Sequence, residues 1–152
     1  MQRKKERNKR IDGRGVRVGI VVARFNSDIT DALLQSALRA LRETRVKSGD
    51  IKILRVPGSF ELPLACARLA ATGEYDALVA LGAVIKGETD HYHFVAGEVS
   101  RGIMEVMLKH DIPIGFGLLT TDTLEQARVR AGKKVDFGAS AAQAALAMAS
   151  LR

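Results

Sequence analysis

The chain has 152 residues, 47% of them hydrophobic and 27% charged, a composition typical of a single globular domain. No apolar run approaches the roughly 20 residues that a transmembrane helix needs, which argues against an integral membrane protein. The basic amino terminus has no hydrophobic segment behind it, so we expect neither a secretory signal nor a membrane partner. We therefore expect a cytoplasmic protein.

The net charge of +7 is concentrated at the amino terminus. Residues 1–15 carry a net charge of +5 and residues 16–152 only +2, so we expect a basic, flexible tail before an α/β domain. The tail can contact nucleic-acid phosphates, but it has no aromatic residue that could stack on a base. Three interpretations stay open: a solvated terminus, incidental binding of polyanions such as nucleic acid, and a tag or engineered extension.

Cys66 is the only cysteine, which excludes an internal disulfide and a zinc site built from several cysteines. It lies in the apolar run 64–67, so we expect a buried thiol rather than a nucleophile. His93 and His110 have no partners at metal-ligand spacing, so we read them as surface or packing residues and expect no bound metal.

Strands and helices alternate along the chain from residue 16 onward. The β-branched run 16–23 predicts a strand buried on both faces. Residues 26–28 offer helix caps, and leucines at helical spacing over 33–41 predict the first helix. The same pattern predicts strands over 51–56, 77–85 and 114–120, and helices starting near 59–61 and covering about 90–110, 123–131 and 139–151. This alternation indicates a single doubly wound (flavodoxin-like) α/β domain, a four-stranded parallel sheet flanked by helices.

The turn after the third predicted strand is the most informative segment. The apolar run 77–85 stops before Gly87, and Thr89 and Asp90 suit a helix N-cap. Free backbone N–H groups at a helix start attract phosphate, and a histidine such as His91 can move protons near neutral pH. The turn is neither a Walker A loop nor a GxGxxG fingerprint, so it does not indicate a nucleoside triphosphate or a dinucleotide.

Ligands of parallel α/β sheets bind at the carboxyl ends of the strands. Four predicted segments meet at that edge: 24–26, 57–61, 85–91 and 121–122. Together they contain two phenylalanines, one carboxylate, the glycine turn and one histidine. This set predicts a planar polar ring stacked by phenylalanine, hydroxyl groups bound by a glutamate, and a phosphate at the turn.

Motifs in these segments resemble the lumazine synthase family over nearly all of residues 16–151. The motifs are Ala23-Arg24-Phe25-Asn26, Val56-Pro57-Gly58-Ser59-Phe60-Glu61-Leu62-Pro63, the stretch from Leu81 to Tyr92, the stretch from Gly117 to Ala127, and Arg130-Ala131-Gly132. The resemblance implies condensation of 5-amino-6-(D-ribitylamino)uracil with 3,4-dihydroxy-2-butanone 4-phosphate, which yields 6,7-dimethyl-8-ribityllumazine, phosphate and water. It implies that no cofactor is needed.

The resemblance also assigns roles to individual residues. It implies that His91 is the proton shuttle, that Phe25 stacks on the pyrimidine and that Glu61 accepts hydrogen bonds from hydroxyl groups. The ribitylaminouracil positions are Phe25, Ser59, Phe60, Glu61, Ala83, Val84, Ile85 and Phe116, and the phosphate positions are Gly87, Glu88, Thr89 and Arg130. In the family, Phe116 and Arg130 come from the neighbouring subunit.

The family builds its sites between the chains of a pentamer, so we expect a homo-oligomer, either a free pentamer or a 60-subunit shell of twelve pentamers. Riboflavin synthase is a candidate partner. One segment departs from the family. Residues 133–138 form a shorter loop than the family's Gly-Asn-Lys-Gly segment, and Phe137 stands near the position where the family has its loop lysine. Lys133 or Lys134 is the candidate replacement. Two other functions stay open: a catalytically weak flavin- or lumazine-binding relative, and a self-assembling shell scaffold.

Overall fold

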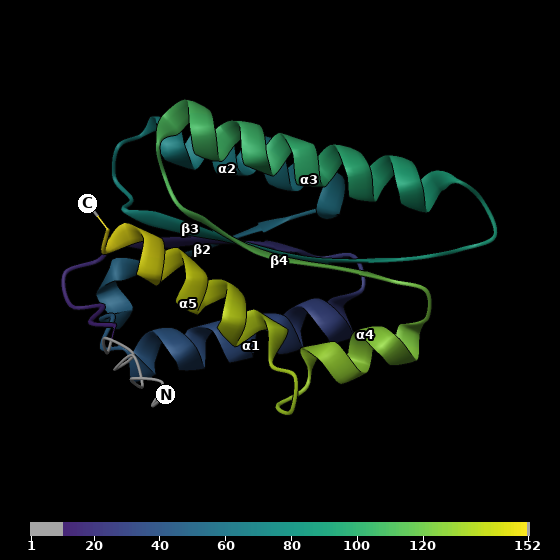
Figure 1. Ribbon diagram of the computed structural model, residues 1–152, viewed down its shortest axis with the longest axis horizontal. Helices are drawn as coiled ribbons and strands as arrows, with labels where there is room; N and C mark the ends of the chain where they lie inside the picture. Colours follow the sequence, from purple (N-terminus) through teal and green to yellow (C-terminus); the bar gives the residue numbers. More distant parts are fainter. Residues whose placement is uncertain (1–10, 152) are drawn as a thin grey trace, which may run out of the picture.

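Four parallel strands form one sheet in the computed structural model, which describes residues 11–151 (Figure 1). The strand order is β2-β1-β3-β4, which confirms the predicted flavodoxin-like fold. The strands are β1 (Val18–Ala23), β2 (Ile51–Val56), β3 (Ala77–Ile85) and β4 (Ile114–Thr121). The helices are α1 (Ser27–Glu43), α2 (Leu62–Ala71), α3 (His91–His110), α4 (Leu124–Ala131) and α5 (Phe137–Ala149), with short 3-10 turns η1 (Ser48–Asp50) and η2 (Ser59–Glu61).

Helices cover both faces of the sheet. In Figure 1, α2 and α3 lie on one face, and α1, α4 and α5 lie on the other. Every residue of β1 is buried: Val18, Ile20 and Val22 pack towards α1 and α5, while Val21 and Ala23 pack towards α2 and α3. The predicted strand buried on both faces is therefore confirmed, and its continuous apolar run is typical of a covered parallel sheet.

The predicted elements are all present, and the differences lie at their ends. The first strand begins at Val18 instead of residue 16, because the amide of Arg17 donates to the carboxylate of Asp76 at 2.9 Å instead of to a strand. The last helix begins at Phe137, two residues before the predicted start. The second helix follows η2 with Pro63 in its first turn, where proline is tolerated, as predicted.

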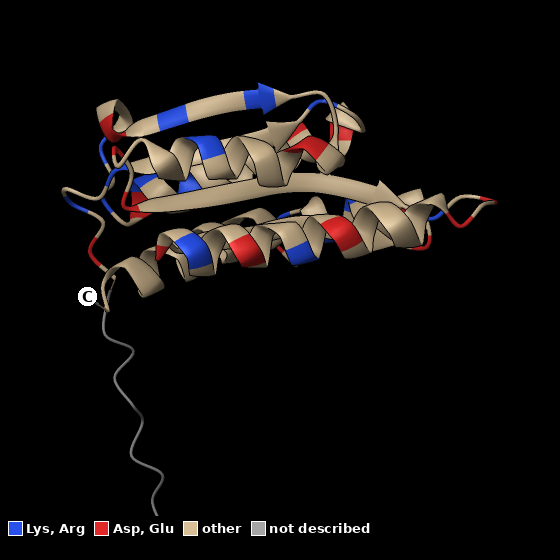
Figure 2. Ribbon diagram, turned by 90° about the horizontal axis from the view of Figure 1, so that it is seen from above, with Lys and Arg blue, Asp and Glu red and all other residues tan. Residues whose placement is uncertain are grey.

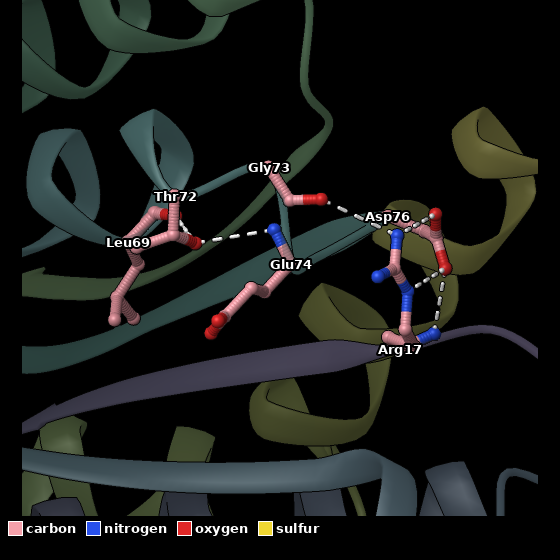
Figure 3. A network of polar contacts seen from close by, with 6 residues as sticks. All are labelled: Arg17, Leu69, Thr72, Gly73, Glu74 and Asp76. Carbon is pink, nitrogen blue, oxygen red and sulfur yellow. Dashed lines mark hydrogen bonds and ion pairs between the residues drawn. The ribbon is translucent and has the colours of Figure 1, made fainter.

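An ion pair ties the amino ends of β1 and β3 together (Figure 3). The Arg17 guanidinium contacts both carboxylate oxygens of Asp76 at 3.2 Å and also donates to the carbonyl of Gly73. In the adjoining turn, the amide of Glu74 donates to the hydroxyl of Thr72 at 3.1 Å. These contacts link the turn before β3 to the segment that enters β1.

The predicted cap of the first helix is confirmed in position, at Asn26, but not as a side-chain hydrogen bond. Asn26 occupies the N-cap position of α1, but its side chain bonds no amide of the helix. Its Nδ2 instead donates to the carbonyl of Ala83 at 2.9 Å, on a different strand. A side-chain cap does occur at α4, where Thr123 and Gln126 form a reciprocal capping box.

Residues 1–10 of the predicted flexible tail lie outside the described residues. Residues 11–15 lie against the end of α1: the amide of Gly13 donates to the carbonyl of Thr44 at 2.7 Å, and Ile11 packs against the core. Cys66 is fully buried, and burial raises the pKa of its thiol to about 12, which confirms the predicted buried thiol. Within residues 11–151, no helix is long and apolar enough to cross a membrane.

Candidate active site at the carboxyl edge of the sheet

A pocket of about 830 Å³ opens where β1, β2 and β3 end. The predicted ligand edge therefore contains a real cavity. Ten of the predicted site residues line it: Phe25, Ser59, Phe60, Glu61, Ala83, Val84, Ile85, Gly87, Thr89 and His91.

Two phenylalanines present exposed rings at this pocket. Phe25 follows β1 and is 71% exposed, and Phe60 lies in η2 and is 64% exposed. A large aromatic side chain normally gains stability by burial, so two exposed rings at one cavity are available for stacking on a planar ligand.

Glycines shape the wall that carries the polar groups. A Cβ at Gly58 would make only ordinary contacts, at 3.8 Å from Oε2 of Glu61 and 4.0 Å from Cβ of Phe25, so Gly58 lies close to both residues. A Cβ at Gly82 would lie only 2.5 Å from Oγ of Ser59. Ser59, which is buried, therefore packs directly against the bare backbone of β3.

The turn after β3 leads straight into α3. The amide of Lys86 donates to the carbonyl of Thr121 at 2.8 Å, which is the last backbone bond between the β3 and β4 ends. Gly87, Thr89 and His91 then line the pocket, and the hydroxyl of Thr89 accepts a long hydrogen bond of 3.4 Å from the amide of His91. Asp90 occupies the predicted N-cap position, but its side chain makes no cap hydrogen bond.

One face of α3 adds residues that the sequence analysis did not identify. Tyr92, Phe94, Val95 and Glu98 line the pocket together with His91. Their positions follow the helical repeat from residue 91, and this periodicity is the signal that could have found them. Charges alternate along this helix (Figure 2), and Arg101 pairs with Glu98 at 2.6 Å. Asn26 and Gly58 also line the pocket.

Three predicted site residues do not line this pocket. Glu88 is exposed in the turn, and Phe116 lies on β4, 41% exposed. Arg130 lies on α4, on the opposite face of the sheet from α3 (Figure 1), and its Nη1 donates to the carbonyl of Gln126 at 3.1 Å. Among residues 11–151, the pocket lining includes Glu61 and Glu98 but no lysine or arginine.

The segment before α5 does not reach the pocket either. Lys133 and Lys134 are exposed, and Phe137 packs partly buried against the core. Asp136 pairs with Arg39 at 3.3 Å. Across the described part of the chain, no three His, Cys, Asp or Glu side chains gather closely enough to hold a metal ion.

The fold and the pocket define a flavodoxin-like α/β protein with a small-molecule site at the carboxyl ends of its strands. The family model described as 6,7-dimethyl-8-ribityllumazine synthase matches residues 15–152. A 6,7-dimethyl-8-ribityllumazine synthase from Anaeromyxobacter sp. (strain Fw109-5) is 51% identical over 138 residues, which cover 90% of this chain and 85% of that protein. The chain belongs to the 6,7-dimethyl-8-ribityllumazine synthase family, whose members are transferases of riboflavin biosynthesis.

Proposed function

We propose that this pocket condenses 5-amino-6-(D-ribitylamino)uracil with 3,4-dihydroxy-2-butanone 4-phosphate to 6,7-dimethyl-8-ribityllumazine. The observation that carries the proposal is the meeting, in one cavity, of two exposed aromatic rings, a carboxylate and a glycine turn with a histidine. The rings of Phe25 and Phe60 suit the planar uracil, and Glu61 with Ser59 suits the ribityl hydroxyl groups. Backbone groups of Ala83, Val84 and Ile85 would meet the polar edge of the uracil.

The chemistry needs proton transfers rather than a cofactor. The aromatic amine condenses with the ketone and releases one water. Loss of a proton from the adjacent carbon then allows phosphate to leave, and the second amine closes the ring with release of another water. His91 stands beside the Gly87–Thr89 turn and is the one histidine of the pocket lining in the described residues, so we assign it these transfers.

The phosphate favours a cation, and the described residues of the pocket lining supply none. The turn offers backbone donors of Gly87, Glu88 and Thr89, but the lining contains no basic side chain among the described residues. We therefore propose that Arg130 and Phe116 of a second copy complete the site, in a pentamer built from head-to-tail contacts. The 60-subunit shell is the larger assembly compatible with this arrangement, and native mass spectrometry distinguishes the two.

Turnover by the purified protein is the decisive test. Both substrates are mixed with the enzyme, and lumazine fluorescence is followed together with phosphate release. We expect one phosphate per lumazine, and no product when either substrate is omitted. A protein that binds lumazine or riboflavin without turnover would instead be the catalytically weak relative, for which the altered 133–138 loop is the supporting feature. Co-purified nucleic acid that salt removes would support a scaffold with a polyanion-binding tail.

Shared sites can be tested by complementation. One chain carries Phe25→Ala, another carries Arg130→Ala, and the two are co-assembled. Random pairing leaves about a quarter of the sites with both residues intact, because each site draws one residue from each of two neighbours. Activity should therefore rise above both parents. A verified mixed assembly that stays as inactive as its parents would refute the shared site.

The remaining proposals concern cellular context. We propose a domain from residue 16 onward, a cytoplasmic location, and riboflavin synthase as a partner, because that enzyme consumes the lumazine product. The family match from residue 15 supports the domain boundary. Cell fractionation tests the location, and co-sedimentation of the two purified enzymes tests the partnership.

A further inference from the structure

Asn26 lies between the two strand ends that bound the pocket. Its backbone is left-handed, with φ 59° and ψ 49°, a conformation that asparagine tolerates better than most residues. Its side chain is partly buried, and Nδ2 donates to the carbonyl of Ala83 at 2.9 Å, across 57 positions of sequence. The side chain therefore links the β1–α1 connection to β3 and does not cap α1.

The carbonyl of Ala83 needs this donor because β1 is shorter than β3. The pairing of β1 with β3 ends at Val22 and Leu81, whereas β3 continues to Ile85. Ala83 is only 2% exposed, and a buried carbonyl without a partner destabilises the fold. The side-chain amide of Asn26 replaces the backbone N–H group that the next residue of a longer β1 would have donated.

Backbone bonds hold the other side of the same segment to β2. The amide of Arg24 donates to the carbonyl of Val56 at 2.8 Å, and the amide of Phe25 donates to the carbonyl of Pro57 at 3.0 Å. Phe25 is therefore fixed between the ends of β2 and β3. Because Phe25 is 71% exposed, its backbone bonds to the end of β2 and the Asn26–Ala83 bond to β3, rather than core packing, determine where the ring stands.

We infer that Asn26 is a positioning residue: its bond to Ala83 holds Phe25 where the ring stacks on the uracil substrate. The inference rests on the proposed function, because it takes the pocket to be the uracil site. Asn26 also lines the pocket, but its Nδ2 is bonded to the Ala83 carbonyl, so we assign it an effect on substrate through Phe25. The bond also occupies the Ala83 carbonyl, so that carbonyl is already partnered before substrate arrives.

Two substitutions isolate the bond from the backbone conformation. Asn26→Gly keeps a left-handed backbone without strain and removes the donor. Asn26→Asp keeps the shape of the side chain but turns a carboxylate oxygen towards the Ala83 carbonyl. Arg45→Gly is the matched control, because Arg45 is also left-handed, with φ 71°, and lies beyond the far end of α1.

The measurements are the Kd of 6,7-dimethyl-8-ribityllumazine by fluorescence titration and the KM of each substrate. Loss of one hydrogen bond predicts a roughly 3–10-fold rise in the Kd and in the KM of the uracil substrate for Asn26→Gly, and a larger rise for Asn26→Asp. The KM of the phosphate substrate should stay unchanged, as should every constant of Arg45→Gly. A general loss of folded protein would instead lower the apparent kcat and leave the Kd and both KM values unchanged.

A double-mutant cycle decides whether Asn26 acts through Phe25. In a Phe25→Ala background, Asn26→Gly should cost less than about 2-fold, because the ring that it positions is gone. An equal penalty in both backgrounds, or wild-type affinity in Asn26→Gly, overturns the inference. Active wild-type enzyme with unaffected Asn26 variants refutes only the role of Asn26. Wild-type protein that neither binds the lumazine nor consumes both substrates refutes the proposed function itself.

Discussion

Replacing Gly82 by alanine tests how the pocket wall holds Ser59. The new Cβ would lie 2.5 Å from Oγ of Ser59, about 1 Å short of the roughly 3.5 Å at which nonbonded heavy atoms normally meet. It would also lie 3.0 Å from Cδ1 of Leu118 and 3.1 Å from Cδ1 of Leu62. The hydroxyl must therefore move, and both leucines must give way by a few tenths of an ångström.

Overpacking of this kind costs about 1–3 kcal/mol of unfolding free energy. For a domain of this length, each kcal/mol lowers the melting temperature by about 2–4 °C. We expect Gly82→Ala to lower the melting temperature by roughly 2–12 °C, measured by circular dichroism. The KM of the uracil substrate should rise as well, because the displaced hydroxyl of Ser59 is the group assigned to the ribityl chain.

Two further variants make the result specific. Gly97→Ala is the control, because its Cβ meets nothing within 4 Å and alanine favours the helix, so its melting temperature should not fall. Ser59→Ala removes the nearest clashing atom and should recover part of the stability that Gly82→Ala loses. Unchanged melting of Gly82→Ala, or no recovery in the double variant, would show that Ser59 and Gly82 are not in close contact.

Three other predictions address catalysis and charge. His91→Asn should lower kcat by at most about 10²-fold, because water and the substrate phosphate can also carry protons. His93→Asn is the control and should leave kcat unchanged. A loss of kcat above about 10⁴-fold in His91→Asn, or no loss, refutes the proposed role of His91. Arg130→Ala should raise the KM of the phosphate substrate about 10–100-fold and barely change that of the uracil substrate, and equal changes in both would mean a structural role. Arg14 and Arg45 hold the pKa of Asp12 at about 2, so stability from this carboxylate is present above its ordinary pKa of 3.8 and is lost as the pH falls towards 2. Acid titration of Asp12→Asn should lack this small component, and a curve identical to wild type would contradict it.

The sequence predicted the fold because each strand and helix carries a local signal. The run 18–23 is apolar throughout, as a strand covered on both faces requires. Proline is tolerated only in the first turn of a helix, so Pro63 limits where α2 can begin. The α2 helix begins within that limit, directly after η2. The ends of elements were less predictable, since the start of β1 depends on Asp76, a residue far along the chain.

The site was partly predictable for the same reason. The carboxyl ends of parallel strands converge whatever their side chains, so Phe25, Glu61 and the glycine turn could be assigned to one edge. The role of Asn26 could not be predicted, because its residue type equally suits a helix cap and the bond to Ala83 forms only in the folded chain. The pocket-lining residues of α3 follow a helical periodicity in the sequence, but only the fold shows which face of the helix turns towards the pocket.

The pocket has the properties of half of a composite site. It exposes the rings of Phe25 and Phe60 to water, and in the described residues it offers acidic but no basic side chains. Exposed aromatic rings favour a covering surface, and a phosphate at the Gly87–Thr89 turn favours a cation. Phe116 and Arg130 are an aromatic ring and a cation of the kinds required, and neither lines the pocket of its own chain. The head-to-tail contact that we propose between two copies would bring these groups to the pocket without any change in the fold of either chain.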